Sequence, residues 1–208
     1  MTEKADRQRT LAARVVLVLS LAALVADGWI AQVWGRRWDA TRELWLARST
    51  GWTAVGALVF ALSATPAGRL LARLPGRSRD VSWVPAFRRA FGIAAGSFAL
   101  LHAATVFGGY LRGAWVAVLS FSYLRAGLLA LIIQCAMLAT SFPSLVRHLR
   151  VKAWKPLHRL GYLVAILVLQ HLLLSPFAPR AMTLELFAAV FAVGLLRLLP
   201  RSPTSDAQ

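Results

Sequence analysis

Cysteine is almost absent from this sequence. The 208 residues include a single cysteine, Cys135, which lies inside an apolar run. One thiol excludes an internal disulfide, a CxxC redox pair, a cysteine-ligated iron–sulfur cluster and the CxxCH motif that attaches haem covalently. We therefore interpret Cys135 as a small side chain packed within the protein.

Acidic side chains are also scarce, with eight Asp and Glu against 24 Lys and Arg. None is expected at the middle of an apolar segment, because the two nearest, Asp27 and Glu185, fall near segment ends. Proton and cation pathways usually need buried carboxylates, so this pattern disfavours a transporter. The Walker and GxGxxG motifs are missing too, which excludes a nicotinamide-binding reductase domain within this chain.

Apolar side chains, by contrast, are abundant. They make up 58% of the sequence, and the mean hydropathy is +0.61. A soluble domain of this size would leave much of that surface in water, so the composition indicates one polytopic membrane bundle without a second soluble domain. Spans of about 20 apolar residues are expected at 11–30, 48–67, 90–111, 122–143, 158–176 and 182–199. The expected fold is an all-α, six-helix transmembrane bundle.

Proline positions and the chain ends agree with these limits. Pro66, Pro143 and Pro176 fall at or between the expected span ends, where helix breakers belong. Residues 1–10 are expected to form a cytoplasmic segment, 11–199 one transmembrane domain and 200–208 a cytoplasmic tail.

The basic residues of 7–14 followed by the apolar stretch 15–26 also resemble a signal peptide. An uncleaved first helix is favoured because no convincing cleavage site follows directly.

The net charge of +16 is distributed over short segments between apolar runs. With the N-terminus inside, seven of the 24 basic residues fall in outer segments: Arg36, Arg37, Arg42, Arg48, Arg112, Arg125 and Arg180. The excess of basic residues on the other side follows the positive-inside rule and predicts that both termini are cytoplasmic. Nucleic-acid binding is disfavoured, since no basic patch with interleaved aromatic residues lies on a soluble unit.

Three of the four histidines stand in or beside apolar segments: His102, His158 and His171. A buried imidazole is costly without a partner, no carboxylate is placed to provide one, and neutral imidazole is a common metal ligand. His102 lies roughly 18 Å along its span, and His171 lies roughly 18–20 Å beyond His158 on a span of the same direction. His102 and His171 should therefore share a depth in the outer half of the membrane. Two facing imidazoles at one depth can hold a haem b from both sides.

His158 falls at the inner membrane edge, where it is either a cofactor ligand or an interfacial side chain. The 13 residues between His158 and His171 correspond to about 220° of rotation, so on a straight helix the two do not point the same way. His148 lies between basic residues and is expected to be solvated.

Small residues precede His102 on its span. Ala95 and Ala99 lie on nearly the same helical face as the histidine and would leave room for a flat macrocycle. Gly92 and Gly96 form a small-xxx-small pair, which we interpret as a site of close helix packing.

Three stretches resemble the MsrQ/YedZ family of haem-binding membrane subunits, which belongs to the wider ferric-reductase-like transmembrane superfamily. Residues 154–171, WKPLHRLGYLVAILVLQH, carry the strongest likeness, and LHRLGYL is its most specific part. Residues 88–92, RRAFG, leading to His102, are similar to the third helix of the family. Residues 50–54, with Thr65 and Pro66, resemble its second span, and the likeness covers roughly residues 48–200.

The resemblance implies a b-type haem protein of a bacterial cytoplasmic (inner) membrane that serves as an electron-transfer subunit rather than a catalytic one. It implies electrons from the quinone pool or a cytosolic flavin reductase, passed to a periplasmic molybdopterin enzyme that repairs methionine sulfoxide in proteins. FMN is associated with the family, although no flavin motif can be identified in this chain.

The same resemblance makes His102 and His171 axial ligands of an outer haem, with His158 on the inner side. The superfamily has a second histidine on its third helix, but the position 14 residues before His102 is Arg88. A second haem is therefore doubtful, and Arg88 is suited instead to a haem propionate or a flavin phosphate.

Two other functions stay open on the sequence alone. A haem-containing reductase of ferric chelates or other metals would use the same two ligands with a different electron acceptor. A small permease or assembly factor would use the histidines only for hydrogen bonds between helices.

Overall fold

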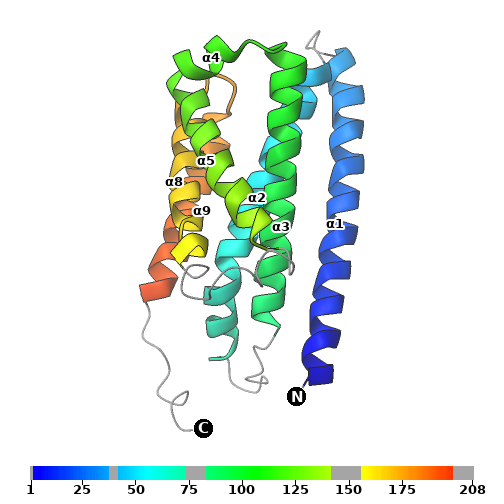
Figure 1. Cartoon of the computed structure of the whole chain (residues 1–208), viewed down its shortest axis with the longest axis vertical. Helices are drawn as coiled ribbons and strands as arrows, with labels where there is room; N and C mark the ends of the chain where they lie inside the picture. Colours follow the sequence, from blue (N-terminus) through cyan, green and yellow to red (C-terminus); the bar gives the residue numbers. More distant parts are fainter. Residues whose placement is uncertain (1, 38–41, 74–82, 142–155, 199–208) are drawn as a thin grey trace.

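The computed structural model describes residues 2–37, 42–73, 83–141 and 156–198, and every regular element in these ranges is helical (Figure 1). The elements are α1 (Thr2–Arg37), α2 (Arg42–Leu71), α3 (Val84–Ala104), the π-helix η1 (Thr105–Tyr110), α4 (Trp115–Ser120), α5 (Ser122–Ala139), α8 (Gly161–Leu174) and α9 (Arg180–Leu198). We call the end at which α1 begins the lower end and the end that carries α4 the upper end. The predicted all-α class is confirmed.

Five helical segments are long and apolar enough to cross a membrane: Asp6–Val33, Arg42–Leu71, Val84–Tyr110, Ser122–Ala139 and Pro156–Leu174. They overlap the first five predicted spans, although several limits differ by a few residues. The helix α9 covers the sixth predicted span but is not among the five segments, so the count of six and the orientation of the termini stay predictions. His148 and the tail 200–208 lie outside the described residues.

Two predicted limits of the second span need correction. Pro66 does not end the helix, because α2 continues through it to Leu71 and buries its ring. Proline is tolerated within membrane helices, where neighbouring groups satisfy the backbone carbonyl that it leaves free. At the other end α2 begins at Arg42, six residues before the predicted span. This earlier start places Arg48 on the helix instead of in a loop.

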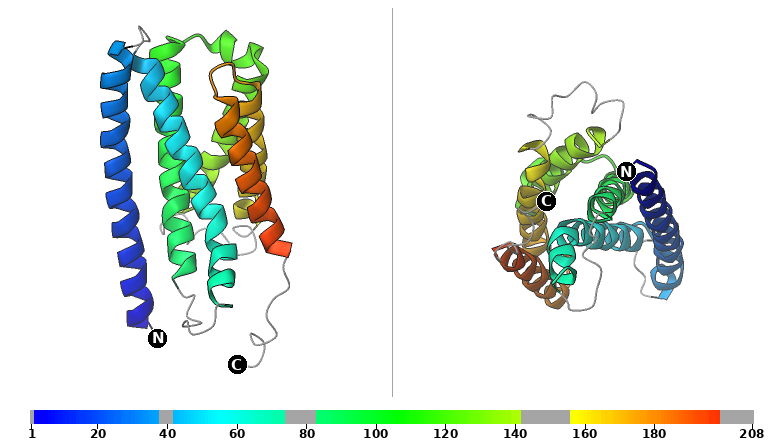
Figure 2. Two further views of the ribbon diagram at one scale, coloured as in Figure 1. Left: turned by 180° about the vertical axis from the view of Figure 1, so that it is seen from behind. Right: turned by 90° about the horizontal axis from the view of Figure 1, so that it is seen from below.

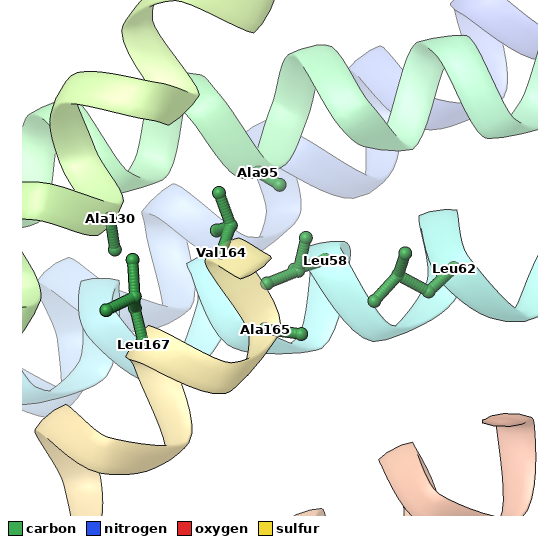
Figure 3. Packing of buried hydrophobic residues seen from close by; sticks show 7 residues of the cluster. All are labelled: Leu58, Leu62, Ala95, Ala130, Val164, Ala165 and Leu167. Carbon is green, nitrogen blue, oxygen red and sulfur yellow. The ribbon is translucent and has the colours of Figure 1, made fainter. Parts of the chain in front are cut away.

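The helices pack around a small apolar core. α2 lies along α3, α5 lies along α8, α1 flanks α2 and α3, and α9 contacts α2 and α8 (Figure 2). The buried core cluster draws on α2, α3, α5 and α8 and consists of Leu58, Leu62, Ala95, Ala130, Val164, Ala165 and Leu167 (Figure 3). Three of these side chains are alanines, which let helix backbones approach closely. The core therefore fixes the four helices from which the site described below is built.

Gly96 marks a close approach of α3 to α5. A Cβ atom added at Gly96 would lie 3.3 Å from the Leu138 Cβ, whereas at Gly92 it would meet nothing within 4 Å. The predicted close packing is therefore confirmed at Gly96 and absent at Gly92.

Substituting these two glycines provides a matched test of that contact. Gly96→Leu should destabilise the bundle by about 1–3 kcal/mol, since a larger side chain must displace Leu138 or separate the helices. Gly92→Leu should leave the stability nearly unchanged. Thermal unfolding of the two purified variants in the same detergent measures the difference, and equal melting temperatures would contradict a tight α3–α5 contact.

Asp27 is buried between α1 and α2. It lies ten residues before the end of α1, is 4% exposed, and accepts hydrogen bonds from the Thr53 hydroxyl at 3.3 Å to each carboxyl oxygen. Asp27 lies six residues before the end of the first candidate span at Val33, near a span end as predicted, and it is buried there against α2. Its contact ties α1 to α2.

Candidate functional site

Two histidines from different helices face each other in the upper half of the bundle. His102 lies two residues before the end of α3 and His171 three residues before the end of α8, and both helices rise toward the upper end (Figure 1). Their ring centroids are 6.3 Å apart and the ring planes are inclined at 79°. The predicted meeting of these two side chains at one depth is confirmed.

Each imidazole is anchored through Nδ1 to a backbone carbonyl of a neighbouring helix. The Nδ1 atom of His102 lies 2.7 Å from the Ala47 carbonyl oxygen on α2, and that of His171 lies 2.7 Å from the Tyr123 carbonyl oxygen on α5. Because a carbonyl oxygen can only accept, each Nδ1 carries the hydrogen and donates it. In a neutral ring the Nε2 atom then keeps its lone pair, which is the form that ligates a metal.

A glycine makes room for each ring. A Cβ atom added at Gly51 would lie 2.9 Å from the His102 Nδ1, and one added at Gly127 would lie 2.9 Å from the His171 Nδ1. In both helices the glycine follows the anchoring carbonyl residue, Ala47 or Tyr123, by four positions. A side chain at the position of Gly51 or Gly127 would cover the carbonyl of the residue four positions earlier, so only glycine leaves that carbonyl open to the imidazole. The two halves of the site thus repeat one arrangement.

A cavity of about 490 Å³ surrounds the two imidazoles. This volume lies within the range of about 300–1,000 Å³ that is usual for cofactor and ligand sites. Its wall is mostly apolar and comes from α2, α3, η1, α4, α5, α8 and the segment that follows α8. Ala99 lines the cavity as predicted, whereas Ala95 is fully buried in the core cluster below it. The few polar side chains on the wall besides the histidines include Arg48 and Gln134.

The π-helix η1 shapes the upper part of this cavity. It continues α3 directly after the turn that carries His102, and Val106, Phe107 and Tyr110 from it line the wall. A π-helical turn inserts an extra residue and rotates the side chains that follow, and such turns are frequent at functional sites. The chain then turns sharply through Arg112 and Gly113, which have φ of 49° and 80°, into α4.

The spacing of the two rings suits a metal atom between them. Metal–imidazole bonds are about 2.0–2.1 Å long, and with about 1.1 Å from nitrogen to ring centre two such ligands have centroids about 6.3 Å apart. A direct N–H···N hydrogen bond of about 2.9 Å would bring the centroids to about 5.1 Å. The observed 6.3 Å equals the spacing of the first arrangement and is longer than that of the second, and it also falls within the range of about 4.5–7 Å of an edge-to-face ring contact.

Protein ligands alone would leave such a metal incompletely coordinated. No group of three or more His, Cys, Asp and Glu side chains able to hold a metal ion occurs in the described ranges. Two axial imidazoles in an apolar cavity are the protein share of a haem site, in which the macrocycle supplies the other four ligands. The residues present therefore fit a b-type haem.

His158 and Arg88 are not part of this cavity wall. His158 lies at the lower start of the fifth candidate span, where its Nε2 is 3.4 Å from the hydroxyl of Thr140, the residue that follows α5. Arg88, near the lower start of α3, lies close enough for its charge to act on the His158 imidazole. The structure thus separates the four predicted site residues into a facing pair, His102 and His171, and a second group at the lower end.

Four residues of the cavity wall are important to the site but are not among the predicted site residues: Arg48, Gly51, Gly127 and Gln134. Glycine in a membrane helix usually indicates helix packing, so neither glycine stands out until its helix is paired with the histidine opposite. Gln134 is the clearest overlooked signal, because an amide in the middle of an apolar run is unusual, and here it is 7% exposed on the cavity wall.

Comparison with known proteins agrees with this architecture. A family profile described as ferric reductase like transmembrane component matches residues 50–169, more than half of the chain. The chain belongs to this family. The matched segment of the ferric-reductase-like family contains His102 and His158 and ends two residues before His171. The pairing of His171 with His102 therefore comes from the structure.

One similar protein narrows the comparison to a subgroup of this family. The protein-methionine-sulfoxide reductase heme-binding subunit MsrQ of Deinococcus radiodurans is 31% identical over 156 residues, which cover 72% of this chain and 71% of that protein. The predicted resemblance to the MsrQ/YedZ group is thereby confirmed, and this member of the ferric-reductase-like family is an MsrQ-like membrane protein.

Proposed function

We propose that this chain is a membrane electron-transfer subunit that binds one b-type haem between His102 and His171. When bound, the haem supplies reversible one-electron chemistry. The observation that carries the proposal is the pair of imidazoles, each fixed through Nδ1 at 2.7 Å from a carbonyl oxygen and spaced 6.3 Å from the other. The Deinococcus relative, whose name describes a heme-binding subunit, supports the same conclusion.

The protein's own contribution is to hold the two rings and to exclude water. The carbonyls of Ala47 and Tyr123 keep each imidazole in one tautomer and one orientation. The apolar wall keeps the surroundings of the site at low dielectric, which favours fixed neutral ligands over solvated charges. These features suit electron transfer, which requires little movement of the ligands.

The position of the site indicates where electrons would leave. The anchor of His171 is the carbonyl of Tyr123, the second residue of α5, so the site lies next to the upper end of the bundle. With both termini cytoplasmic, as the basic residues predict, the upper end faces the periplasm of a bacterial inner membrane. The proposed acceptor there is a periplasmic molybdopterin reductase of protein methionine sulfoxide, and the donor is the quinone pool or a cytosolic flavin reductase.

The lower end would then belong to the electron donor side. His158 and Arg88 provide one imidazole and one cation there, which suit a second haem or the phosphate of FMN. Only one histidine is available in that group among the described residues, so we propose a single resident haem. Residues 11–199 would form the one domain that carries both groups.

Haem quantitation and an acceptor assay test this proposal. Protein purified after expression with ample haem should contain about one haem per chain by pyridine haemochrome. Once reduced in liposomes, it should be reoxidised by methionine sulfoxide only when the periplasmic reductase is added. A purified protein without haem would contradict the proposal. Reoxidation of the reduced protein by ferric chelates, without the partner, would favour a metal reductase instead.

The inclination of the imidazole planes gives a separate spectroscopic prediction. Nearly perpendicular axial rings, as the 79° angle implies, should give ferric haem a strongly anisotropic low-spin EPR spectrum with one dominant low-field feature. Parallel rings would give three resolved rhombic lines. Frozen-solution EPR of the oxidised protein distinguishes the two, and a rhombic spectrum would contradict the observed ring geometry.

A further inference from the structure

Positive charge on the cavity wall is confined to one residue of the described chain, Arg48. It follows Ala47, the anchor of His102, on α2, and it is partly buried. Side chains on a helix lean toward its N-terminus, and α2 descends from the upper end, so Arg48 leans upward. Its guanidinium carbon lies 4.9 Å from the centre of the Trp45 ring, one turn nearer the upper end.

The lower part of the cavity has a different character. One to two turns below Gly51 and Gly127 the wall is formed by Leu58 on α2 and by Leu131 and Gln134 on α5. These side chains provide hydrocarbon and one neutral amide, but no charge. The cavity is therefore polarised, with a cation at its upper part and none at its lower part among the described residues.

This polarity matches the two edges of a b-type haem. One edge carries two propionate carboxylates, and a carboxylate in an apolar cavity is costly unless a cation pairs with it. Arginine is the most suitable partner because its planar guanidinium donates two parallel hydrogen bonds to a carboxylate. No carboxylate of the described residues forms a salt bridge with Arg48, so its donors face no competing anion there.

We propose that Arg48 binds a propionate carboxylate of the haem and thereby fixes the macrocycle with its acidic edge toward the upper end and its hydrocarbon edge toward Leu58 and Gln134. This inference rests on the proposed function and adds a specific determinant of haem orientation. The stacked ring of Trp45 restrains the guanidinium, so less side-chain freedom is lost when the carboxylate binds.

Esterified haem provides the most direct experiment. Apoprotein in detergent is titrated with iron protoporphyrin IX and with its dimethyl ester, which lacks the carboxylates but keeps the iron and the ring. The wild type should bind the free acid about tenfold or more tightly than the ester, as expected for one charge-assisted hydrogen-bonded pair. Equal affinities in the wild type would overturn the proposal without any substitution.

Two variants and a matched control complete the test. Arg48→Gln should lose most of the preference for the free acid and lower the midpoint potential, because removing a nearby cation disfavours the more negative reduced state. Arg48→Lys should retain part of the preference. Arg42→Gln, an exposed arginine on the same helix, should match the wild type. If Arg48→Gln matches Arg42→Gln in both readouts, the proposal is wrong.

The outcome is separable from the proposed function. Failure of the wild type to bind any haem would refute the electron-transfer proposal itself. Normal haem binding with a bis-histidine spectrum, but without a difference between acid and ester, would refute only the role of Arg48.

Discussion

Replacing either His102 or His171 by alanine should reduce the haem content of the purified protein to background. Each imidazole would supply one of the two protein ligands of the haem iron, and the cavity wall contains no other histidine, cysteine or methionine to replace it among the described residues. The remaining imidazole cannot compensate for the lost ligand, because its Nδ1 is fixed at 2.7 Å from a backbone carbonyl oxygen. Pyridine haemochrome quantitation and the reduced-minus-oxidised spectrum measure the effect.

His158→Ala is the informative companion to these variants. Its side chain contacts Thr140 at the lower end and is not part of the cavity wall, so the low-spin spectrum of the upper haem should persist. Complete loss of haem from the His158→Ala variant would show that His102 and His171 are not the two ligands. Full haem content in a His102→Ala, His171→Ala double variant would support the alternative in which these histidines serve only helix packing.

The depth of the two ligands could be predicted from the sequence because it depends on simple geometry. Hydropathy locates the spans, and a rise of about 1.5 Å per residue converts position into depth. His102 and His171 therefore fall at one level once both spans are given the same direction. Their mutual orientation could not be derived this way, because it depends on the rotation of α3 and α8 about their axes, which interhelical packing decides.

The error at Arg48 has a definite physical origin. The predicted second span starts at residue 48, so the sequence places this arginine in the outer segment as a charge that marks orientation. Amphipathic residues at 42–47 extend α2 by more than one turn, and the arginine consequently lies on the cavity wall. Hydropathy windows report the apolar middle of a span and miss helical turns at its ends, where charged side chains of functional sites are often found.

Asp27 illustrates the opposite limit of sequence reasoning. Its position near the end of an apolar run is predicted by the sequence, but its burial is not: α1 continues ten residues beyond it, and the carboxyl group is buried against Thr53. Burial of a single carboxyl group depends on which face of α1 turns toward α2. The α1 sequence alone does not indicate which face turns toward α2, because the Thr53 hydroxyl that pairs with Asp27 lies on the other helix.

Gly51→Ala and Gly127→Ala should each weaken haem binding by about 10–100-fold, the usual effect of losing an outer-shell hydrogen bond of a metal ligand. The added methyl group would lie 2.9 Å from an imidazole Nδ1, so the ring must shift away from the Ala47 or Tyr123 carbonyl that orients it. A freed ring can change its tautomer or rotate, and part of the ferric haem should become high-spin. Haem transfer to apomyoglobin and the optical spectrum of the oxidised protein report the two effects.

Gly56→Ala on the same helix α2 is the matched control, because a Cβ atom there meets nothing within 4 Å. In the interior of a helix this change normally stabilises by roughly 0.5–1 kcal/mol, since glycine is the more flexible residue when unfolded. Gly51→Ala would gain the same helical preference, so its haem loss would have to arise at the ring and not from unfolding. If Gly51→Ala and Gly127→Ala retain haem as firmly as Gly56→Ala, the imidazoles do not depend on these two carbonyls, and the repeated anchoring arrangement has no role in ligation.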